Sequence, residues 1–347
     1  MAAIIGPTTR CPRPVCSICI ANYNGRDFVE KAIQSIYRQD CDFPVEIIVG
    51  DDASTDGSAE LVRAHHPDVG LLVTTTNSGF CAANNRMARH ARGCYLLLLN
   101  NDAELFPNAL SLLHHAAVRE KTPIMLGLPQ YDTFTGKLID RGSLLDPFLN
   151  SVPNVAASQS EVALAMGACL WIPKTVWQEL GGFPKFFDMV AEDTYLCCAA
   201  RLRGCRVKIV SGTGFKHRVG SSLGGGKVVS SRLSTTFRRR SLSERNRAFV
   251  LALVCPSPIV FILLPLHLMS LVVEGFMLSF AKKNADIWRR IYLPALKSLK
   301  HRATDLVRLR KEIQKNRRVS ILRYFSLFTM VPYKLLMLLK HGLPTLR

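Results

Sequence analysis

Short apolar runs alternate with segments of helical periodicity along roughly the first hundred residues of the chain. The apolar runs predict four strands, at 15–21, 45–50, 69–74 and 94–99. Between them, apolar side chains three or four positions apart predict three helices, at 27–37, 58–65 and 82–90. Strands that are apolar throughout and alternate with helices are typical of a mostly parallel sheet covered on both faces. The pattern therefore predicts an α/β domain at the front of the chain.

Polar side chains follow three of these strands directly. Asn22 and Asn24 follow the first strand, Asp51 and Asp52 follow the second, and the triplet 100–102, Asn-Asn-Asp, follows the fourth. Ligands of parallel sheets bind beyond the carboxyl ends of the strands. We therefore expect these side chains to share one edge of the sheet, where a ligand binds.

The stretch 50–60, GDDASTDGSAE, has a structural interpretation and a functional one. A turn with Asp56 or Ser58 capping the next helix explains half of it, but leaves two adjacent carboxylates after a buried strand unexplained. Asp102 can hold Mg²⁺ or Mn²⁺ without a full protein cage, because such cations share their coordination with substrate phosphates. The sequence has no G-x-x-x-x-G-K-[ST] motif. Together these features favour a bound nucleotide diphosphate over ATP hydrolysis.

The formal charge of +19 is confined to the back of the chain. Residues 1–220 carry 21 basic and 21 acidic side chains, whereas residues 221–347 carry 24 basic and 5 acidic ones. No nucleic-acid-binding motif accompanies this excess, so we expect no nucleic-acid partner. The 11 cysteines are scattered, many in apolar runs, which indicates reduced, buried thiols in a cytosolic compartment. A neutral front and a basic back indicate two parts with different roles.

Five segments form an ordered set. They are VCSICIANYNG, IIVGDDASTDGSAE, NSGFCAANNRMARHARGCYLLLLNNDAEL, MGACLWIPKTVWQELGGF and EDTYLCCAARLRG. In this order and at about this spacing they resemble the motifs of family 2 glycosyltransferases, most closely the rhamnosyltransferase-like branch, over residues 14–220. The resemblance implies a GT-A domain, which is Rossmann-like with a mostly parallel sheet. It also implies an inverting, metal-dependent, hexosyltransferase-like enzyme with a UDP- or dTDP-sugar as donor.

The resemblance places a metal site on two residues. The family's D-x-D motif falls on residues 100–102, where Asn100 replaces the first aspartate, so that Asp102 remains as the strong metal ligand. His217 matches a histidine that often completes the metal site in this family. The implied cofactor is Mg²⁺ or Mn²⁺.

The resemblance also implies a set of substrate contacts. The family's nucleobase-binding acid matches Asp51, the first of the pair that Asp52 completes. The other positions implied to contact the substrates are Asn22, Asn24, Asn77, Asn84, Asn100, Asn101 and Gly167. For Asn84, packing on its own helix face is an equal alternative. The family usually follows its G-G-F with Asp, and this chain has Pro184 there, so this region does not fix the sugar or the acceptor.

Glu192 and Asp193 begin a segment with helical spacing that stops at Gly204. An acceptor hydroxyl must lose its proton as it attacks the anomeric carbon, and an ionised carboxylate can accept that proton. The dipole at a helix start keeps such a carboxylate charged at neutral pH. Two acids at a helix start also have a purely structural explanation. In the family resemblance the catalytic base falls on Asp193, and Glu192 supports it or contacts the acceptor.

The residues after 220 have a different character. Residues 221–245, rich in Gly, Ser and Arg, are interpreted as a lid over the donor or as a linker. The hydrophobic and basic region 246–347 follows, and within it residues 248–273 carry no charge and are long enough to cross a bilayer. Prolines are expected to break this run at Pro256, Pro258 and Pro265. We therefore favour a broken hairpin or tilted helices in one leaflet over a single crossing.

Basic residues flank the apolar run on both sides and interleave with the apolar positions that follow it. Positive charge on both sides favours two cytosolic ends, and basic amphipathic segments bind anionic headgroups. A solvated helix packed on the front domain is the alternative. The region is therefore predicted to associate with the cytoplasmic face of the cell membrane, as a monotopic, single or hairpin segment. The predicted acceptor is a lipid-linked or cell-envelope glycan.

Two other functions fit parts of the sequence. A processive polysaccharide synthase has the same fold, but the chain lacks the Q-x-x-R-W signature and the many spanning helices that polymer export requires. A non-enzymatic membrane scaffold on a transferase fold would not need Asp51, Asp102 and Asp193 together. The N-terminal extension, 1–13, is too short and proline-rich for a signal peptide. We expect an enzyme that transfers a sugar, with rhamnose as the sugar that the resemblance suggests.

Overall fold

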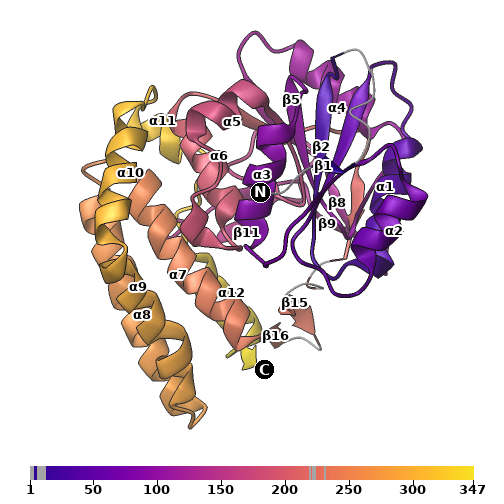
Figure 1. Ribbon diagram of the computed structural model, residues 1–347. Coiled ribbons are helices and arrows are strands. Elements are labelled where there is room, and N and C mark those ends of the chain that lie inside the picture. The colour runs from indigo at the N-terminus through magenta and orange to yellow at the C-terminus, as the bar shows by residue number, and fades with distance from the viewer. Residues whose placement is uncertain (1–3, 6–12, 219, 221–223, 230–231) are drawn as a thin grey trace. The chain divides into compact units, whose positions relative to one another are not determined.

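The computed structural model describes residues 4–5, 13–218, 220, 224–229 and 232–347 (Figure 1). Contacts within the chain divide it into two compact units. The sheet unit comprises Met1–Ser143, Pro153–Met189 and Cys205–Arg218. The helical unit comprises Leu144–Val152, Val190–Gly204 and Val219–Arg347. The sheet unit ends close to the domain boundary predicted at residue 220, whereas the segment Val190–Gly204 groups with the helical unit.

An eight-stranded sheet in the order β1-β4-β3-β2-β5-β12-β7-β13 forms the centre of the sheet unit. Four neighbouring strands run parallel: β4 (Gly70–Val73), β3 (Val45–Asp51), β2 (Cys16–Asn22) and β5 (Tyr95–Asn100). Two further strands are antiparallel to their neighbours: β1 (Ile4–Ile5) pairs with β4, and β12 (Cys169–Pro173) pairs with β5 and β7. The last two strands, β7 (Ile124–Gly127) and β13 (Arg206–Ile209), pair with each other in parallel. The sheet confirms the predicted α/β, mostly parallel fold class.

The register of the parallel strands decides which strand ends meet. Asn22 at the end of β2 pairs with Asp51 at the end of β3. On the other side of β2, Ala21 pairs with Asn100 at the end of β5. The three polar strand ends therefore lie side by side at one edge of the sheet, as the sequence pattern predicts.

Helices cover both faces of this sheet. Cys16, Ile18 and Ile20 on one face of β2 belong to a core cluster with apolar residues of α1 (Arg26–Tyr37), α2 (Ser58–His65) and α4 (Ala109–Val118). On the opposite face, α3 (Phe80–His90) approaches so closely that a Cβ at Gly50 would touch the Met87 sulfur. The helix α5 (Lys174–Leu180) follows β12 directly and begins after Pro173, which cannot continue the strand ladder. Burial on both faces explains why the strands are apolar throughout.

A second sheet of four short strands, β6-β14-β8-β9, lies in the same unit. Its strands are β6 (Ala103–Leu105), β14 (Phe215–His217), β8 (Gln130–Asp132) and β9 (Leu138–Asp140). Pairing of β14 between β6 and β8 places His217 opposite both Ala103 and Asp132. Three smaller elements complete the connections, β10 (Ser143–Leu145), β11 (Ser151–Pro153) and the 3₁₀ turn η1 (Lys185–Phe187).

The helical unit begins with α6 (Glu192–Leu202), whose bounds agree with the helix predicted from Glu192 to a stop at Gly204. Three short strands follow in one sheet, β15 (Gly225–Val229), β16 (Arg232–Thr235) and β17 (Thr345–Leu346). Of the predicted lid or linker, residues 221–223 and 230–231 lie outside the described residues. The remaining helices are α7 (Phe237–Val254), α8 (Val260–Ala281), the π-helix η2 (Trp288–Tyr292), α9 (Leu293–His301), α10 (Ala303–Lys315), α11 (Ile321–Phe325) and α12 (Tyr333–His341).

The apolar run predicted between 248 and 273 is divided between two helices. Pro256 and Pro258 fall in the gap between α7 and α8, as expected for residues that lack an N–H donor. The prediction that Pro265 also breaks the run was wrong, because Pro265 lies inside α8. Pro265 is exposed, and the helix continues through it. Among the described residues, α8 is the one helix long and apolar enough to cross a membrane, on length and composition alone.

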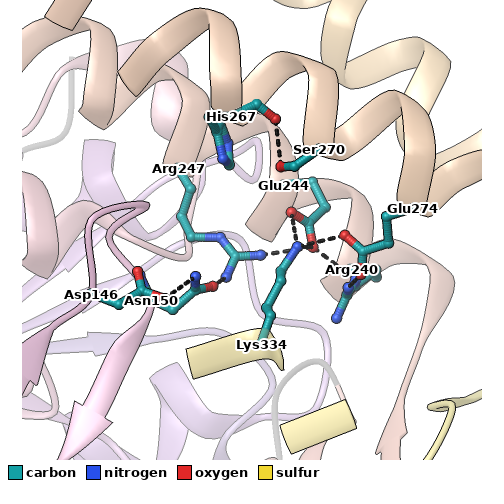
Figure 2. A network of polar contacts seen from close by, with 9 residues as sticks. All are labelled: Asp146, Asn150, Arg240, Glu244, Arg247, His267, Ser270, Glu274 and Lys334. Carbon is teal, nitrogen blue, oxygen red and sulfur yellow. Dashed lines mark hydrogen bonds and ion pairs between the residues drawn. The ribbon is translucent and has the colours of Figure 1, made fainter. Parts of the chain in front are cut away.

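A network of buried charges joins α7, α8 and α12 (Figure 2). Glu244 of α7 is fully buried and forms ion pairs with Arg240 Nε at 2.8 Å, Arg247 Nη2 at 2.7 Å and Lys334 Nζ at 2.8 Å. Glu274 of α8 pairs with the same Arg240 and, at 2.8 Å, with Lys334. Burial alone would raise the pKa of Glu244, but the three cations outweigh it and hold that pKa well below its ordinary value. The network fixes three helices to one another through paired charges.

Candidate active site

The strand ends of β2, β3 and β5 form one hydrogen-bonded cluster. Asn22 Nδ2 donates to Asp51 Oδ2 at 2.8 Å and to Ser58 Oγ at 2.9 Å. Asn101 Nδ2 donates to Asn22 Oδ1 at 2.8 Å. Asp51 also accepts from the Ser54 backbone N–H at 2.9 Å. The structure thus brings together Asn22, Asp51 and Asn101, which the sequence predicts as donor contacts.

The loop after β2 is held against the loop after β3. Asn24 Oδ1 accepts from the Thr55 backbone N–H at 2.8 Å, and Asn24 N donates to Ser54 Oγ at 2.9 Å. Asn24 has φ of 48°, a left-handed conformation that asparagine tolerates better than most residues. The next residue is Gly25, where a Cβ would collide with Asn22 Oδ1 and Asn101 Nδ2. Glycine is therefore required here for the Asn22–Asn101 contact to form.

Asp52 holds the loop that precedes α3. Its Oδ2 accepts from the backbone N–H groups of Ser78 and Gly79, both at 2.7 Å. Its Oδ1 accepts from Ser78 Oγ at 2.7 Å and from Arg86 Nη2 at 2.8 Å. Both carboxylate oxygens are engaged inside the protein, and only 3% of the residue is exposed. Through this loop Asp52 positions the exposed side chain of Asn77, whose Oδ1 accepts from Gly79 N at 3.0 Å.

Two other predicted contact residues lie in less open positions. Asn84 is 1% exposed, and its Nδ2 donates within α3 to the Phe80 carbonyl at 2.9 Å. This geometry fits the alternative that Asn84 packs on its own helix. Gly167 is buried and precedes Ala168, whose carbonyl accepts from Asn100 N at 3.0 Å. Gly167 therefore lies next to the strand end that carries residues 100–102.

The predicted metal ligands are in contact. His217 Nε2 lies 3.2 Å from Asp102 Oδ1, and both side chains are largely buried. Asn100 Nδ2 lies 3.3 Å from the same Nε2 atom, and Gln130 Nε2 lies 2.9 Å from His217 Nδ1. Strand β14 delivers the histidine, β8 delivers the glutamine, and the end of β5 delivers the other two residues. Side chains separated by more than one hundred positions thus form one cluster.

This cluster fits a divalent cation. Asp102 and His217 would supply a carboxylate and an imidazole, and a divalent cation commonly takes its other ligands from phosphates and water. Among the described residues, no three or more His, Cys, Asp or Glu side chains converge. The buried oxygens Asn100 Oδ1 and Gln130 Oε1 have no hydrogen-bond partner within the described chain. The two ends of a carboxamide have the same shape, and the reverse orientation of Gln130 would put Oε1 against Nδ1. His217 would then carry its proton on Nδ1 and present the Nε2 lone pair, as metal-bound histidines do.

The predicted base lies in the helical unit. Glu192 and Asp193 occupy the first turn of α6, and both side chains are partly exposed. Asp193 Oδ1 accepts from the Thr194 backbone N–H at 2.7 Å. Arg239 of α7 is close enough to interact with both acids, since burial lowers its pKa while the charges of Glu192 and Asp193 raise it. The guanidinium of Arg239 and the start of α6 are thus both close to the two acids.

Three residues that contact predicted site residues within their own unit were not predicted from the sequence. Gln130 contacts His217, Arg86 pairs with Asp52, and Arg239 faces the acids of α6. Arg86 lies eight residues after Ser78, within the third motif. Because a helix there can direct Arg86 toward the preceding loop, its contact with that loop could have been predicted from the sequence. Gln130 and Arg239 have no such local signal, because their partners are far away in the sequence.

The family model of Glycosyl transferase family 2 matches residues 17–172. Over these residues, less than half of the chain, the sequence matches a family 2 glycosyltransferase domain. The match begins in β2 and ends in β12, so it contains the strand ends that carry Asn22, Asp51 and Asp102. His217 and the acids of α6 lie beyond the matched residues.

Curated relatives share this glycosyltransferase domain over part of their length. The putative teichuronic acid biosynthesis glycosyltransferase TuaG of Bacillus subtilis (strain 168) is 29% identical over 93 residues, which is 26% of this chain and 36% of that protein. Chondroitin synthase of Pasteurella multocida (strain Pm70) is 28% identical over 112 residues, which is 31% of this chain and 11% of that protein. The matches thus span well under half of these relatives.

Solved structures have the same fold as the glycosyltransferase domain. GalNAc-T7 with UDP, GalNAc and Mn²⁺ has a TM-score of 0.56 and 15% identity, covering 70% of this chain and 48% of that chain. S. aureus TarS 1-349 in complex with UDP-GlcNAc has a TM-score of 0.53 and 18% identity, covering 86% of this chain and 90% of that chain. At these identities the likeness shows a GT-A-like fold alone.

Proposed function

We propose that this chain is an inverting, metal-dependent glycosyltransferase that moves a sugar from a nucleotide diphosphate to a hydroxyl group. The observation that carries the proposal is the pair Asp102–His217, 3.2 Å apart, next to the polar strand ends of a family 2 domain. A carboxylate and an imidazole with room for further ligands suit Mg²⁺ or Mn²⁺ held together with phosphate oxygens. The structural neighbours described with UDP and Mn²⁺ or with UDP-GlcNAc support a nucleotide-sugar donor.

Each group at the strand ends has a part in holding the donor. Asp51 is assigned to the nucleobase, from whose N–H it would accept a hydrogen bond, and Asn22 orients that carboxylate. Asn77, Asn100 and Asn101 are assigned to the ribose, phosphates and sugar. When bound, a divalent cation would be held by Asp102 and His217 and would neutralise charge on the departing diphosphate. Asp52 supports the donor site by keeping the loop before α3 in place.

Transfer requires one proton acceptor. The acceptor oxygen forms a bond to the anomeric carbon, the bond from that carbon to the phosphate oxygen breaks, and the electron pair leaves with the nucleotide diphosphate. The hydroxyl proton passes to the carboxylate of Asp193 as the new bond forms. Glu192 supports Asp193 or contacts the acceptor, and the positive charge of Arg239 interacts with both acids. Attack opposite the leaving group inverts the configuration at the anomeric carbon.

The finer assignment concerns the sugar, the acceptor and the location. The rhamnosyltransferase-like motifs favour a dTDP- or UDP-linked sugar such as rhamnose. The likeness to a putative teichuronic acid glycosyltransferase supports a cell-envelope glycan as acceptor. The basic, apolar region after residue 246 favours a lipid-linked form of that acceptor at the cytoplasmic face of the membrane.

A processive synthase is the second candidate, and one comparison favours it. The chain resembles part of the chondroitin synthase of Pasteurella multocida. The length of the product made from a single acceptor separates the two, because a processive enzyme extends each acceptor many times before release. We expect one sugar to be added per acceptor.

The test begins with hydrolysis of a panel of nucleotide sugars by the full chain with Mg²⁺ or Mn²⁺. One sugar nucleotide is expected to be cleaved faster than the others, and chelation of the cation is expected to abolish cleavage. No cleavage of any donor and no metal-dependent binding of UDP or dTDP would contradict the proposal and favour a scaffold.

The Asp193→Asn variant tests the assignment of the base. We expect transfer to an acceptor to fall by about a hundredfold or more, since a positioned base contributes 10²–10⁴-fold. Binding of UDP or dTDP, measured by titration calorimetry, should stay the same. Glu312→Gln is the matched control, since it removes an exposed carboxylate elsewhere in the helical unit. Equal transfer by the Asp193→Asn variant and the control would place the base at another residue.

A further inference from the structure

The helix α8 has one buried face and one exposed face. The buried stripe recurs at helical spacing and consists of Val260, His267, Leu271, Gly275 and Leu278. The exposed stripe between them carries large apolar side chains, namely Phe261, Ile262, Leu266, Met269, Val273, Phe276, Met277 and Phe280. Exposed apolar side chains in such number on one helix mark an interaction surface.

The buried face of α8 is held by other elements of the helical unit. A Cβ at Gly275 would lie 2.7 Å from the Trp288 ring and 2.8 Å from the Tyr292 ring, so η2 packs directly on the α8 backbone. Glu274 pairs with Arg240 of α7 and with Lys334 of α12 (Figure 2). These contacts place polar and aromatic groups of three elements along one side of α8.

A helix that crosses a bilayer on its own contacts lipid on all sides. For α8 this would remove Glu274 from both of its cations and leave Lys334 and Arg240 with Glu244 alone. Separating buried charges from their partners is costly in water and more so in lipid. Contact with lipid through the exposed stripe alone keeps the network intact.

We propose that α8 lies along one leaflet of an anionic bilayer, with its exposed apolar stripe inserted and its buried face held by the charge network. The proposal deepens the membrane location given under the proposed function, but it does not depend on the transfer reaction. It commits α8 to a one-sided, interfacial position and excludes a crossing.

The charge around α8 fits an anionic surface. Lys282 and Lys283 follow the helix, Arg289 and Arg290 stand on η2, and all four are exposed. The acids of the region have cationic partners: Glu244 and Glu274 belong to the network, Asp286 lies 4.0 Å from Arg290, and Asp305 pairs with Arg302 at 3.2 Å. Lys282, Lys283 and Arg289 remain as exposed basic residues beside α8 without an ion pair among the described residues. Basic residues beside an apolar helix face attract anionic headgroups to the depth at which that face inserts.

The first test measures binding of the full chain to vesicles of phosphatidylcholine with about a third phosphatidylglycerol. A double variant, Phe276→Glu and Phe280→Glu, is expected to weaken binding by tenfold or more, because two carboxylates would have to enter the acyl region. The matched control is Val118→Glu with Val155→Glu, two exposed apolar positions of the sheet unit, and it should bind as the unchanged chain does. Equal binding by both double variants, or no binding by the unchanged chain, would overturn the proposal.

The second test separates a leaflet position from a crossing. Cysteine replaces Ser257 at one end of α8 and Ala285 at the other, and both positions are exposed. In the same chain the native Cys11 and Cys94 are replaced by serine. The protein is synthesised with sealed vesicles and then treated with a maleimide that cannot cross lipid. Both positions are expected to react without detergent. Protection of one position until detergent is added would show a crossing and overturn the proposal.

These outcomes are independent of the proposed reaction. Cleavage of a soluble nucleotide sugar needs no vesicle and should be the same for both double variants. A chain that cleaves its donor but does not bind vesicles would contradict the inference and leave the transferase proposal standing. A chain that binds vesicles but cleaves no donor would support the inference and contradict the transferase proposal.

Discussion

Asp51 and Asp52 are adjacent in the sequence and have separate roles in the fold. Successive side chains of a strand point to opposite sides, and at the end of β3 this directs Asp51 toward Asn22 and Ser58. Asp52 instead caps the loop before α3 and pairs with Arg86 at 2.8 Å. One carboxylate therefore lies in the cluster of strand ends, while the other supports the loop that carries Asn77.

Gln130 provides a prediction at the level of one side chain. If its amide orients His217 for metal binding, Gln130→Ala should lower the affinity for Mn²⁺ by about tenfold, which is typical for loss of such an outer partner. The measurement is electron paramagnetic resonance of free Mn²⁺ in the presence of UDP. Gln178→Ala, at an exposed glutamine of α5, is the control. Equal affinities in the two variants would show that Gln130 has no role in the metal site.

Two cysteines of β2 show how burial changes the chemistry of a single side chain. Cys16 and Cys19 lie in β2 and are both fully buried. Burial raises the pKa of Cys19 to about 12, so this thiol stays protonated and unreactive near neutral pH. Both thiols are therefore part of a packed strand, in agreement with the buried thiols predicted from the sequence.

At the scale of elements, α7, α8 and α12 depend on each other through ionic contacts as well as apolar ones. Glu244 has no exposed surface and three cationic partners, so its helix cannot be stable in that position without them. Lys334 is the residue through which α12 joins the other two helices, although α12 itself has no fully buried side chain. The short final helix is therefore positioned by charge more than by apolar burial.

Replacing Glu244 tests this dependence. Glu244→Gln should lower the free energy of unfolding at neutral pH by about 3–5 kcal/mol, the usual cost of breaking a buried ion pair. The pKa of Glu244 is lowered in the folded state, so its stabilisation is present above the unfolded pKa of about 4.3 and is lost as pH falls through the folded pKa. The difference between the variant and the unchanged chain should therefore shrink only in acid below about pH 4.

Urea unfolding followed by far-ultraviolet circular dichroism, at neutral pH and in acid, measures this difference. Glu312→Gln removes an exposed carboxylate from α10 and should change stability little at either pH. A Glu244→Gln chain as stable as that control would show that the network contributes nothing to folding.

At the scale of the whole molecule, charge is divided unevenly between two regions of the chain. Residues 1–220 have no net charge, while residues 221–347 carry the whole formal charge of +19. Under the proposed function, donor binding by the neutral region would not depend on long-range attraction, whereas the basic region would be drawn toward anionic lipid. Binding of a soluble donor and encounter with a membrane-bound acceptor should therefore respond differently to salt.

Salt provides the corresponding prediction. Raising the salt concentration from 0.1 M to 1 M shortens the screening length from about 10 Å to about 3 Å. Transfer to a lipid-linked acceptor in anionic vesicles should show a KM for the acceptor raised several-fold. Cleavage of the donor in solution should change much less. An equal effect of salt on both activities would show that the basic region does not recruit the chain to its acceptor.

Much of the sheet unit follows from the sequence alone. The strands and helices predicted between 15 and 99 agree with β2 to β5 within one or two residues at most ends, because period and apolar content are local properties. The polar strand ends were also predictable, since parallel strands must deliver their carboxyl ends to one edge. His217 could be matched from the resemblance, but not its contact with Gln130, which lies 87 residues away.

The sequence by itself determined the alternation of strands and helices, the polar residues at the strand ends and the division of charge along the chain. Only the tertiary structure decided which partners those residues take, such as Arg86 for Asp52 and three cations for Glu244. It also decided that α8 has one buried and one exposed face, although its sequence is apolar all round. The physical reason is that periodicity and charge depend on neighbours in the chain, whereas hydrogen bonds, ion pairs and burial depend on groups that folding brings together from distant positions.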